Sequence, residues 1–360
     1  MKRTFLFTLA MSLLAFNSFA QKTQERNGWD ESRVVITGNV ESVAITAYEL
    51  KDVFGTVQKG RMSDDKLIYT FNEKGDVAVK ACYDTDGNLD YKYVYQYKPE
   101  SGIIDKTKYN SSAEVDNKRI YKYAANGNLL EESSYNSDGS LAWKDLYKYD
   151  EAGNKIEYSE YSSNGSISSK VLYKYEAGRL IEQATYKGDG SLDSKTVLQY
   201  DSNGHLIVKA YYNSDGSSNG KRCAKYDTAG RVIEEASYNS DGSLNEKSTY
   251  KYDSYNNVIE VSFYEYDGSL DYRLTFKYNA AKKVTLKKCF NSNGGLSWSE
   301  AFAYNAAGNT TEYTEFNSDG SIDTKRVFKY DDKGNVVEVR KYKSDILIPM
   351  YTKEYQISYR

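Results

Sequence analysis

The sequence contains few of the residue combinations that form a catalytic centre. His205 is the only histidine, and it leaves a turn at a position that related turns fill mainly with Asn or Arg. A Ser-His-Asp or Cys-His centre would require this residue, and zinc-ligand spacing is absent from the sequence. We interpret His205 as a turn residue. We expect no enzyme activity, no metal site and no cofactor.

Carboxylates are plentiful, with 51 Asp and Glu residues, so the sequence could contain a pair of the glycosidase type. They recur in every repeat described below, whereas we expect the residues of an active site to occur in one repeat only and to break its pattern. The nearest interruption is "NSSAEVDNK" (110–118), which lacks a turn glycine. The phrase "DTDGNLD" (84–90) offers calcium-type oxygen ligands but lacks the bidentate Glu, so we expect a simple turn there.

Aromatic side chains offer a third kind of chemistry, because their faces can stack on sugar rings. The chain has 37 Tyr, 12 Phe and 3 Trp residues. The candidate binding residues are Trp143, Trp298, Tyr147, Tyr149, Tyr173 and Tyr175. The competing interpretation is that the tyrosines only pack against one another.

These aromatic residues belong to an internal repeat. The aromatic residue before each "NSDGS"-type turn recurs every 26 residues, with one step of 25, at Tyr83, Tyr109, Tyr135, Tyr161, Tyr186, Tyr212, Tyr238, Tyr264, Phe290, Phe316 and Tyr342. A second series has the same period and the same slip, at Phe71, Tyr97, Tyr123, Tyr149, Tyr175, Tyr200, Tyr226, Tyr252, Tyr278, Tyr304 and Tyr330. Two series that share one slip indicate a structural repeat.

Each repeat contains two turn phrases with strand-like segments between them. Phrases such as "YNSDGS" and "YDEAGN" are rich in Asn, Asp and Gly, which favour tight turns. The intervening segments contain β-branched and aromatic residues. The sequence therefore predicts an all-β fold, an antiparallel meander of about 20 or more strands built from 26-residue β-hairpins. A flat sheet of that many strands would be roughly 100 Å wide, so we expect a coiled or curved sheet, either a superhelix or an open shell.

Alternation along the strands predicts two different faces. With four-residue loops, Tyr147 and Tyr149 lie on one face together with Ile156. Glu157 lies on the other face, which carries the lysines, and it lies opposite Lys170 of the next strand. Repetition gives a ladder of opposite charges. We interpret this ladder as a solvated face that sets the register, and a ligand track is the alternative.

The turn phrases resemble the YD repeats of the Rhs family. "YKYDEAGNKI" (147–156), "YKYEAGRLI" (173–181) and "KYDTAGRVIEE" (225–235) are similar to the family phrase Tyr-x-Tyr-Asp-x-x-Gly-Arg-Leu, over about residues 71–342. The stretch 38–60 also resembles the opening of uncharacterised secreted repeat proteins of Bacteroidetes. The Rhs resemblance implies a spiralling β-sheet that can wrap around a toxin. The period here is longer than that of typical Rhs units, and Asn often replaces the family's Arg.

The first residues have the pattern of a secretory signal. Lys2 and Arg3 precede an apolar stretch, and small residues at Ser18 and Ala20 predict cleavage after Ala20. No cysteine follows this point directly, so we do not expect a lipoprotein, and no later apolar run is long enough for a transmembrane segment. We expect a signal peptide at 1–20, a linker with capping strands at 21–70, the repeat array at 71–342 and a capping strand at 343–360.

The net charge bears on the kind of partner, and the cysteines bear on the presence of disulfides. The formal net charge of −3 does not favour nucleic-acid binding. Cys82, Cys223 and Cys289 lie in strand-like contexts, where we expect small buried thiols, with a disulfide as the alternative. The sequence predicts a periplasmic or extracellular scaffold that binds a glycan or an envelope protein; its oligomeric state is open. Alternatives are a structural part of a Rhs-like toxin system and a cryptic carbohydrate-active enzyme.

Overall fold

The computed structural model describes residues 36–53, 56–343 and 349–360. The expected signal peptide at 1–20 lies outside these residues, as does the first part of the expected linker. The described residues form one antiparallel sheet of 25 strands with a single 3-10 turn. The elements are β1 (Val40–Val53), β2 (Thr56–Met62), β3 (Lys66–Phe71), β4 (Val77–Tyr83), β5 (Leu89–Lys98), η2 (Pro99–Ser101), β6 (Ile103–Tyr109), β7 (Val115–Tyr123), β8 (Leu129–Asn136), β9 (Leu141–Tyr149), β10 (Lys155–Ser162), β11 (Ile167–Glu176), β12 (Arg179–Lys187), β13 (Leu192–Tyr200), β14 (Leu206–Asn213), β15 (Ser218–Tyr226), β16 (Val232–Tyr238), β17 (Leu244–Tyr252), β18 (Val258–Tyr264), β19 (Leu270–Tyr278), β20 (Val284–Asn291), β21 (Leu296–Tyr304), β22 (Thr310–Asn317), β23 (Ile322–Tyr330), β24 (Val336–Lys343) and β25 (Pro349–Tyr359).

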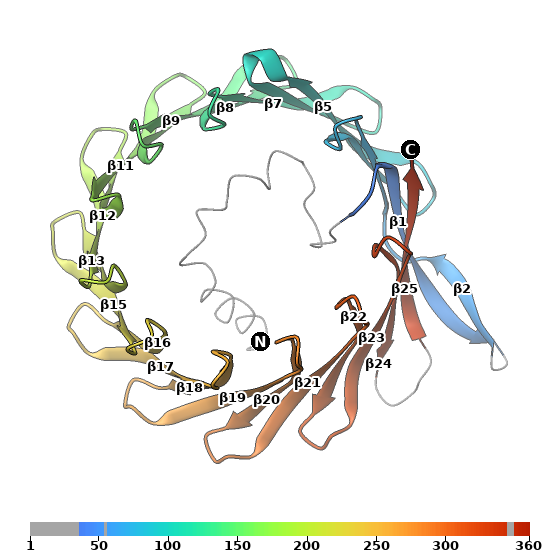
Figure 1. Ribbon diagram of the computed structural model, residues 1–360. Coiled ribbons are helices and arrows are strands. Elements are labelled where there is room, and N and C mark those ends of the chain that lie inside the picture. Colours follow the sequence, from blue (N-terminus) through green and yellow to red (C-terminus); the bar gives the residue numbers. More distant parts are fainter. Residues whose placement is uncertain (1–35, 54–55, 344–348) are drawn as a thin grey trace.

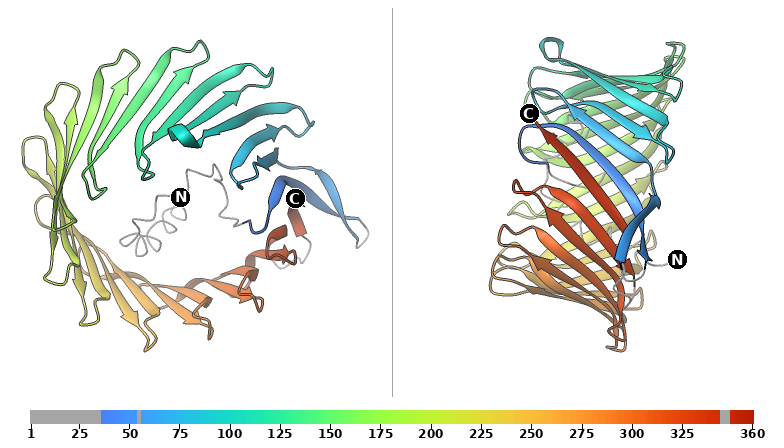
Figure 2. Two further views of the ribbon diagram at one scale, coloured as in Figure 1. Left: turned by 45° about the horizontal axis from the view of Figure 1, so that its top comes forward. Right: turned by 90° about the vertical axis from the view of Figure 1, so that its right-hand side faces the viewer.

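The sheet closes into a barrel (Figures 1 and 2). Val43 of β1 lies opposite Tyr69 of β3 on one side and opposite Ile357 of β25 on the other. The wall therefore consists of 24 strands, namely β1 and the 23 strands β3–β25, while β2 pairs with the second half of β1 and projects from the ring. The expectation of an open, coiled sheet is wrong. Closure pairs both edges of the meander, which an open sheet would leave exposed.

The recurring turn phrases form two kinds of tight loop. In the first kind, the Asp150 amide donates to the carbonyl of Asn154 (2.9 Å), and the Asn154 amide donates to the Asp150 carboxylate (2.8 Å). Gly153 has a φ of 82°, a left-handed conformation that glycine adopts without a steric penalty. In the second kind, the Asn136 amide donates to the carbonyl of Ser140 (2.9 Å) in the same way, but the Ser140 amide donates to the carboxylate of Asp138 (2.9 Å), only two residues earlier. These local bonds explain why the chain repeats the same short phrases.

The predicted assignment of side chains to faces holds for the tyrosines. Tyr147 lies opposite Tyr158, and Lys148 lies opposite Glu157, so Tyr147 and Tyr149 share one face while Glu157 shares the other with the lysine. The predicted register of Glu157 is wrong, because Leu172 and not Lys170 lies directly opposite it, although Lys170 still reaches the Glu157 carboxylate at 3.8 Å. The loops at 150–154 and 162–166 hold five residues rather than the four assumed, and a bulge beside each of these turns inserts one more residue, so the pairing differs from the predicted one by two residues. A shift of two changes partners but leaves each side chain on its face.

The bulge also changes the place of the isoleucine column. Ile156 is the extra residue between Lys155 and Glu157, and it is 37% exposed, so its predicted packing with the tyrosines is wrong. The residue before it fills that place instead. Val232 and Val258, the equivalents of Lys155, pack with Tyr250 in an apolar cluster.

We call the face with Tyr147 and Tyr149 the tyrosine face, and the face with Lys148 and Glu157 the charge face. On the tyrosine face, the last tyrosine of a strand donates its hydroxyl to a backbone carbonyl 20 residues earlier, as Tyr149 does to Leu129 (2.9 Å). The pairing of β8 with β9 begins only at Glu131, so this phenol caps a carbonyl beyond the ladder. The same bond is made by Tyr97, Tyr175, Tyr200, Tyr226, Tyr252, Tyr278, Tyr304 and Tyr330.

On the charge face, lysines pair with glutamates of the following strand. Lys148 lies 3.0 Å from Glu157, and Lys170 reaches the same carboxylate from the other side at 3.8 Å. Equivalent direct pairs are Lys122–Glu131, Lys174–Glu182, Lys225–Glu234, Lys251–Glu260 and Lys329–Glu338. The long side chains cover small buried residues such as Ser133 and Ser159, so the predicted charge ladder exists with shifted partners.

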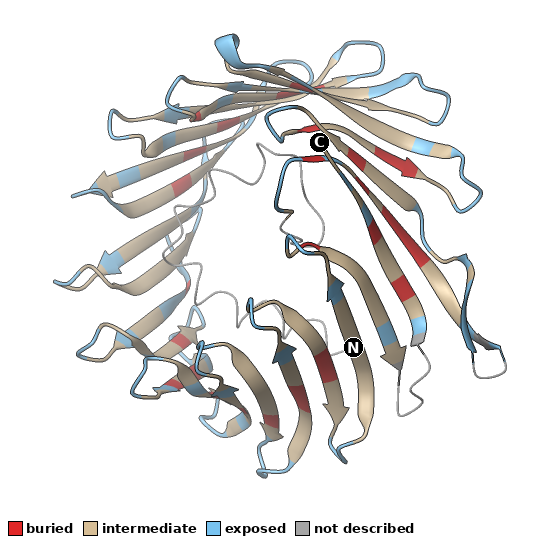
Figure 3. Ribbon diagram, turned by 45° about the vertical axis from the view of Figure 1, so that its right-hand side comes forward, coloured by how far each residue is buried: buried red, intermediate tan, exposed pale blue. Residues whose placement is uncertain are grey.

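The wall is a single layer, and its buried residues lie along the strands (red in Figure 3). The largest apolar cluster lies at the closure, where Val43, Ile45, Tyr69 and Tyr355 pack together on the tyrosine face. Val43 is fully buried, and Tyr69 is 2% exposed. The burial of these side chains stabilises the seam between the first and last strands.

Candidate functional site

All six candidate residues lie on the tyrosine face, in β9, β11 and β21. The hydroxyls of Tyr149 and Tyr175 bind the backbone carbonyls of Leu129 and Lys155, which gives these two tyrosines a structural role. Tyr147 contacts the ring of Tyr158 at 5.2 Å between centroids. The ammonium group of Lys155 lies 4.9 Å from the ring of Tyr173.

Two neighbouring columns, one on each face, differ in how strictly they repeat. On the charge face, the position of Lys144 is Lys or Arg in each repeat from β5 to β23 except at Ser299. On the tyrosine face, the next position along the strand changes in size and charge from repeat to repeat: Tyr93, Arg119, Asp145, Val171, Thr196, Arg222, Ser248, Leu274, Glu300 and Arg326. This varied column makes the tyrosine face the candidate for selective chemistry, while the same face also carries the strictly repeated Tyr149 column.

One polar cluster surrounds Trp143. The guanidinium of Arg119 lies 5.5 Å from its ring. Asp145 and Glu160, which lie opposite each other, both hydrogen-bond the hydroxyl of Tyr158, at 3.0 and 2.7 Å. Burial raises the pKa of Asp145, and the Glu160 carboxylate raises it further. Burial and the two carboxylates likewise raise the pKa of Tyr158, which keeps its hydroxyl protonated.

A second cluster surrounds Trp298 at the equivalent strand position. The ammonium group of Lys287 lies 4.7 Å from the indole ring and 3.4 Å from Glu300. Tyr313 hydrogen-bonds Glu315, which lies opposite Glu300. Each tryptophan of the array is thus accompanied by a cation and by two opposed carboxylates, both of which bind a tyrosine hydroxyl near Trp143 and one of which does so near Trp298.

A pocket of about 530 Å³ lies between β13 and β17, where the column of aromatic residues is interrupted. Most strands place Tyr or Phe at the position of Tyr147, but β13 has Leu198 and β15 has Ala224. Ala224 is the smallest residue in that column, and it lines the pocket together with Lys209, Arg222 and Glu246. The sequence showed this gap, because the period aligns Ala224 with the aromatic residues, but residue-type motifs did not direct attention to it.

His205 lies at the edge of this pocket. Its ring stacks on Tyr226 at 4.6 Å, and its Nδ1 lies 2.9 Å from the Asp201 carboxylate. The Asp201 carboxylate also accepts the His205 amide at 2.8 Å, in the same turn pattern as Asn154. The interpretation of His205 as a turn residue is confirmed by these bonds, and the structure adds that the residue lines the pocket.

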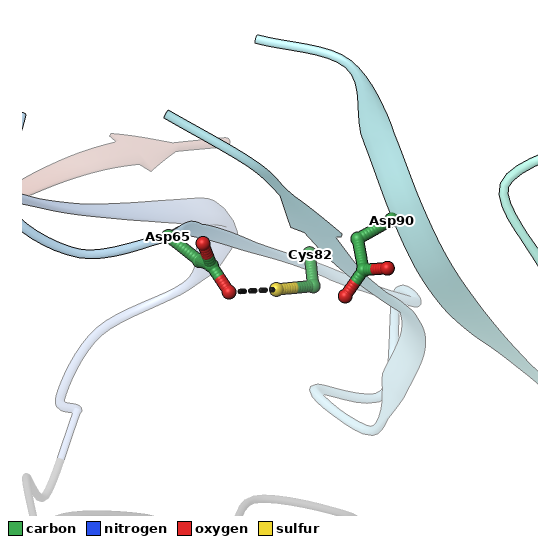
Figure 4. A group of neighbouring side chains, drawn as sticks. All are labelled: Asp65, Cys82 and Asp90. Carbon is green, nitrogen blue, oxygen red and sulfur yellow. Dashed lines mark hydrogen bonds between the residues drawn. The ribbon is translucent and has the colours of Figure 1, made fainter. Parts of the chain in front are cut away.

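Three residues near the start of the array form a different cluster (Figure 4). The thiol of Cys82 lies 3.6 Å from the Asp65 carboxylate, and Asp90 stands on the other side. Burial raises the pKa of Cys82, which favours the thiol over the metal-binding thiolate. The two carboxylates are exposed. This environment gives no specific support to a metal ion.

The remaining sequence features have structural explanations. In "DTDGNLD", the Asp84 carboxylate accepts the amides of Asp86 and Asn88, so the phrase is a turn as expected. In "NSSAEVDNK", Ala113 takes the left-handed position of the usual glycine, with a φ of 62°. The three cysteines are free; Cys82 and Cys289 are buried as predicted, while Cys223 is partly exposed.

Comparisons with known proteins identify no family. No family model matches the chain, and no curated protein matches it in sequence. Among solved structures, TcdB2-TccC3 is similar with a TM-score of 0.27 and 11% identity over 78% of this chain. The chain spans about a quarter of that protein (24%). The resemblance to YD repeats therefore remains unconfirmed as a family membership.

Two similar structures are porin-like proteins from Bacteroides. The protein from Bacteroides uniformis has a TM-score of 0.26 and 10% identity, covering 89% of this chain and 98% of its own. The protein from Bacteroides vulgatus has a TM-score of 0.22 and 9% identity, covering 90% and 99%. With TM-scores this low, the barrel described above rests on its own strand pairing. Separately, the described residues include no helix with the length and apolar character needed to cross a membrane.

Proposed function

We propose that this protein is a non-catalytic barrel of the periplasm or the cell exterior that binds a carbohydrate through its tyrosine face. The main support is the contrast between two neighbouring columns: the Lys144 column of the charge face repeats a cation, while the Asp145 column of the tyrosine face varies in size, polarity and charge. Indole and phenol rings beside carboxylates are the groups that stack on sugars and accept their hydroxyl protons.

We place the tyrosine face on the inside of the ring. Side chains converge on the concave side of a curved sheet, so large groups become buried there. The buried aromatic residues Tyr69, Tyr250, Tyr313 and Tyr355 all belong to this face, whereas Ser133 and Ala184, buried on the charge face, are small. At about 4.8 Å per strand and a tilt of about 40°, a ring of 24 strands is roughly 50 Å wide, which leaves room for an oligosaccharide.

The charge face then meets the surroundings of the barrel. Pairs such as Lys148–Glu157 and Lys251–Glu260 are repeated around it, and their lysine side chains are 63% and 69% exposed. Charged side chains are costly on a lipid-facing barrel wall. This composition supports an aqueous location, in agreement with the signal pattern of the sequence.

A glycan-panel binding assay tests the proposal. We expect the double variant Trp143→Ala/Trp298→Ala to weaken carbohydrate binding at least tenfold, because both indoles lie on the binding face. The control is Lys148→Ala/Lys174→Ala, which removes two cations from the charge face and should bind as the wild type does. Absence of binding to any carbohydrate would refute the proposal. New reducing ends in the bound glycan would refute its non-catalytic part.

A further inference from the structure

The pocket between β13 and β17 has an unusual arrangement of charge. Lys209 of β14 and Arg222 of β15 lie directly opposite each other on the tyrosine face. Opposed side chains of like charge destabilise a sheet unless something lies between them. In the described part of the chain, neither forms a salt bridge, although lysines of the charge face pair repeatedly with glutamates.

The carboxylates of the pocket lie on the opposite side. Glu235 of β16 lies opposite Ala224, and its carboxylate accepts the Tyr250 hydroxyl at 2.5 Å. Glu246 of β17 is exposed and lies two strands from Arg222, with Ser237 between them. Among the described residues, the pocket thus has two cations without a carboxylate partner at one side, of which Lys209 lies 5.5 Å from the ring of Tyr211, and hydrogen-bond acceptors at the other.

The gap at Ala224 makes this arrangement accessible. In β9, β11 and β17 the same position holds Tyr147, Tyr173 and Tyr250, whose rings occupy the space over the neighbouring strands. The small side chain of Ala224 leaves open the volume of about 530 Å³, which is enough for one or two sugar units. Since a tyrosine is accommodated at equivalent positions, the scaffold does not require an alanine here.

We propose that this pocket binds an acidic sugar, a pyranose that carries a carboxylate. The carboxylate lies between Lys209 and Arg222 and relieves their repulsion, with the guanidinium offering two parallel hydrogen bonds. The ring hydroxyls donate to Glu246 and to the free carboxylate oxygen of Glu235. This inference rests on the proposed carbohydrate-binding function and names the class of sugar.

Isothermal titration calorimetry with oligogalacturonate tests the inference. We expect Arg222→Gln and Lys209→Gln each to weaken binding at least tenfold. Lys221→Gln is the matched control, because Lys221 is the neighbour of Arg222 on the same strand but lies on the charge face. We expect Ala224→Tyr to abolish binding without lowering the thermal stability, since it introduces the residue of the equivalent strands.

Control ligands show whether binding requires both the sugar ring and the carboxylate. A neutral oligosaccharide of the same length, acetate and inorganic phosphate should each bind at least tenfold more weakly than oligogalacturonate. Equal binding of the neutral sugar or of phosphate would overturn the inference, as would unchanged binding by Ala224→Tyr. If Trp143→Ala/Trp298→Ala abolishes binding while the pocket variants do not, the proposed function stands and this pocket is not the site. If no carbohydrate binds, both fail.

Discussion

The hydrogen bonds from the last tyrosine of each strand to a backbone carbonyl 20 residues earlier allow a quantitative prediction about stability. In Tyr252, the hydroxyl donates to the Val232 carbonyl at 2.7 Å, and the ring is half-buried. The change Tyr252→Phe keeps the ring and removes only this bond. A neutral hydrogen bond contributes about 1 kcal/mol net, so we expect the free energy of unfolding to fall by about 1 kcal/mol.

Combining such changes magnifies the effect. Tyr149, Tyr200, Tyr252 and Tyr304 lie in different hairpins, and each makes the equivalent bond. Changes at separated sites add, so replacing all four by Phe should cost about 4 kcal/mol. The free energy of unfolding of a folded domain is roughly 5–15 kcal/mol, so this loss would be a large share of it.

Urea unfolding followed by fluorescence measures these changes as shifts in midpoint at constant slope. Tyr255→Phe is the control, because the Tyr255 side chain is 70% exposed. The reasoning would be refuted if Tyr252→Phe were no more destabilising than Tyr255→Phe, or if the fourfold variant lost no more than the single one.

Two further predictions concern alkaline pH and the turns. Burial raises the pKa of Tyr95 and Tyr272 to about 12 from an ordinary value of 10.0, so their contribution to stability is complete below pH 10.0 and is lost as the pH rises through about 12. We expect an alkaline unfolding transition in that window, moved to higher pH by Tyr95→Phe/Tyr272→Phe; ultraviolet titration of tyrosinate checks this, and an unmoved transition would contradict it. Ala113→Gly should raise the free energy of unfolding by about 1 kcal/mol, because Ala113 has a left-handed φ of 62°, which glycine adopts without strain. Ala152→Gly, at an ordinary turn position, should lower it. Thermal unfolding of the two variants tests whether the effects have opposite signs.

Local features of this fold follow directly from the sequence. The shared slip of the two aromatic series establishes the hairpin repeat, and alternation places Tyr147 and Tyr149 on one face. Partners across the strands do not follow, because the bulge at Ile156 is a backbone feature that residue types do not specify. Each bulge adds one residue to a loop that is itself one residue longer than assumed, and the resulting shift of two residues is why Glu157 lies opposite Lys148 and Leu172.

Closure and the pocket were harder to predict for different reasons. Whether the last strand meets the first depends on small angles summed over all the hairpins, and a contact such as Val43 with Ile357 leaves no local signal. The pocket did leave a signal, since Ala224 interrupts a column of aromatic residues. Its opposed cations Lys209 and Arg222 become visible only once the register is known.

Hydroxyl-radical footprinting with and without oligogalacturonate tests the central claim, that the tyrosine face binds the ligand. Mass spectrometry then reports the oxidation of each tyrosine. The account predicts protection of Tyr211, which lines the pocket, and no change at Tyr161 or Tyr238 on the charge face. Protection of the Tyr161 series with no change at Tyr211 would contradict it.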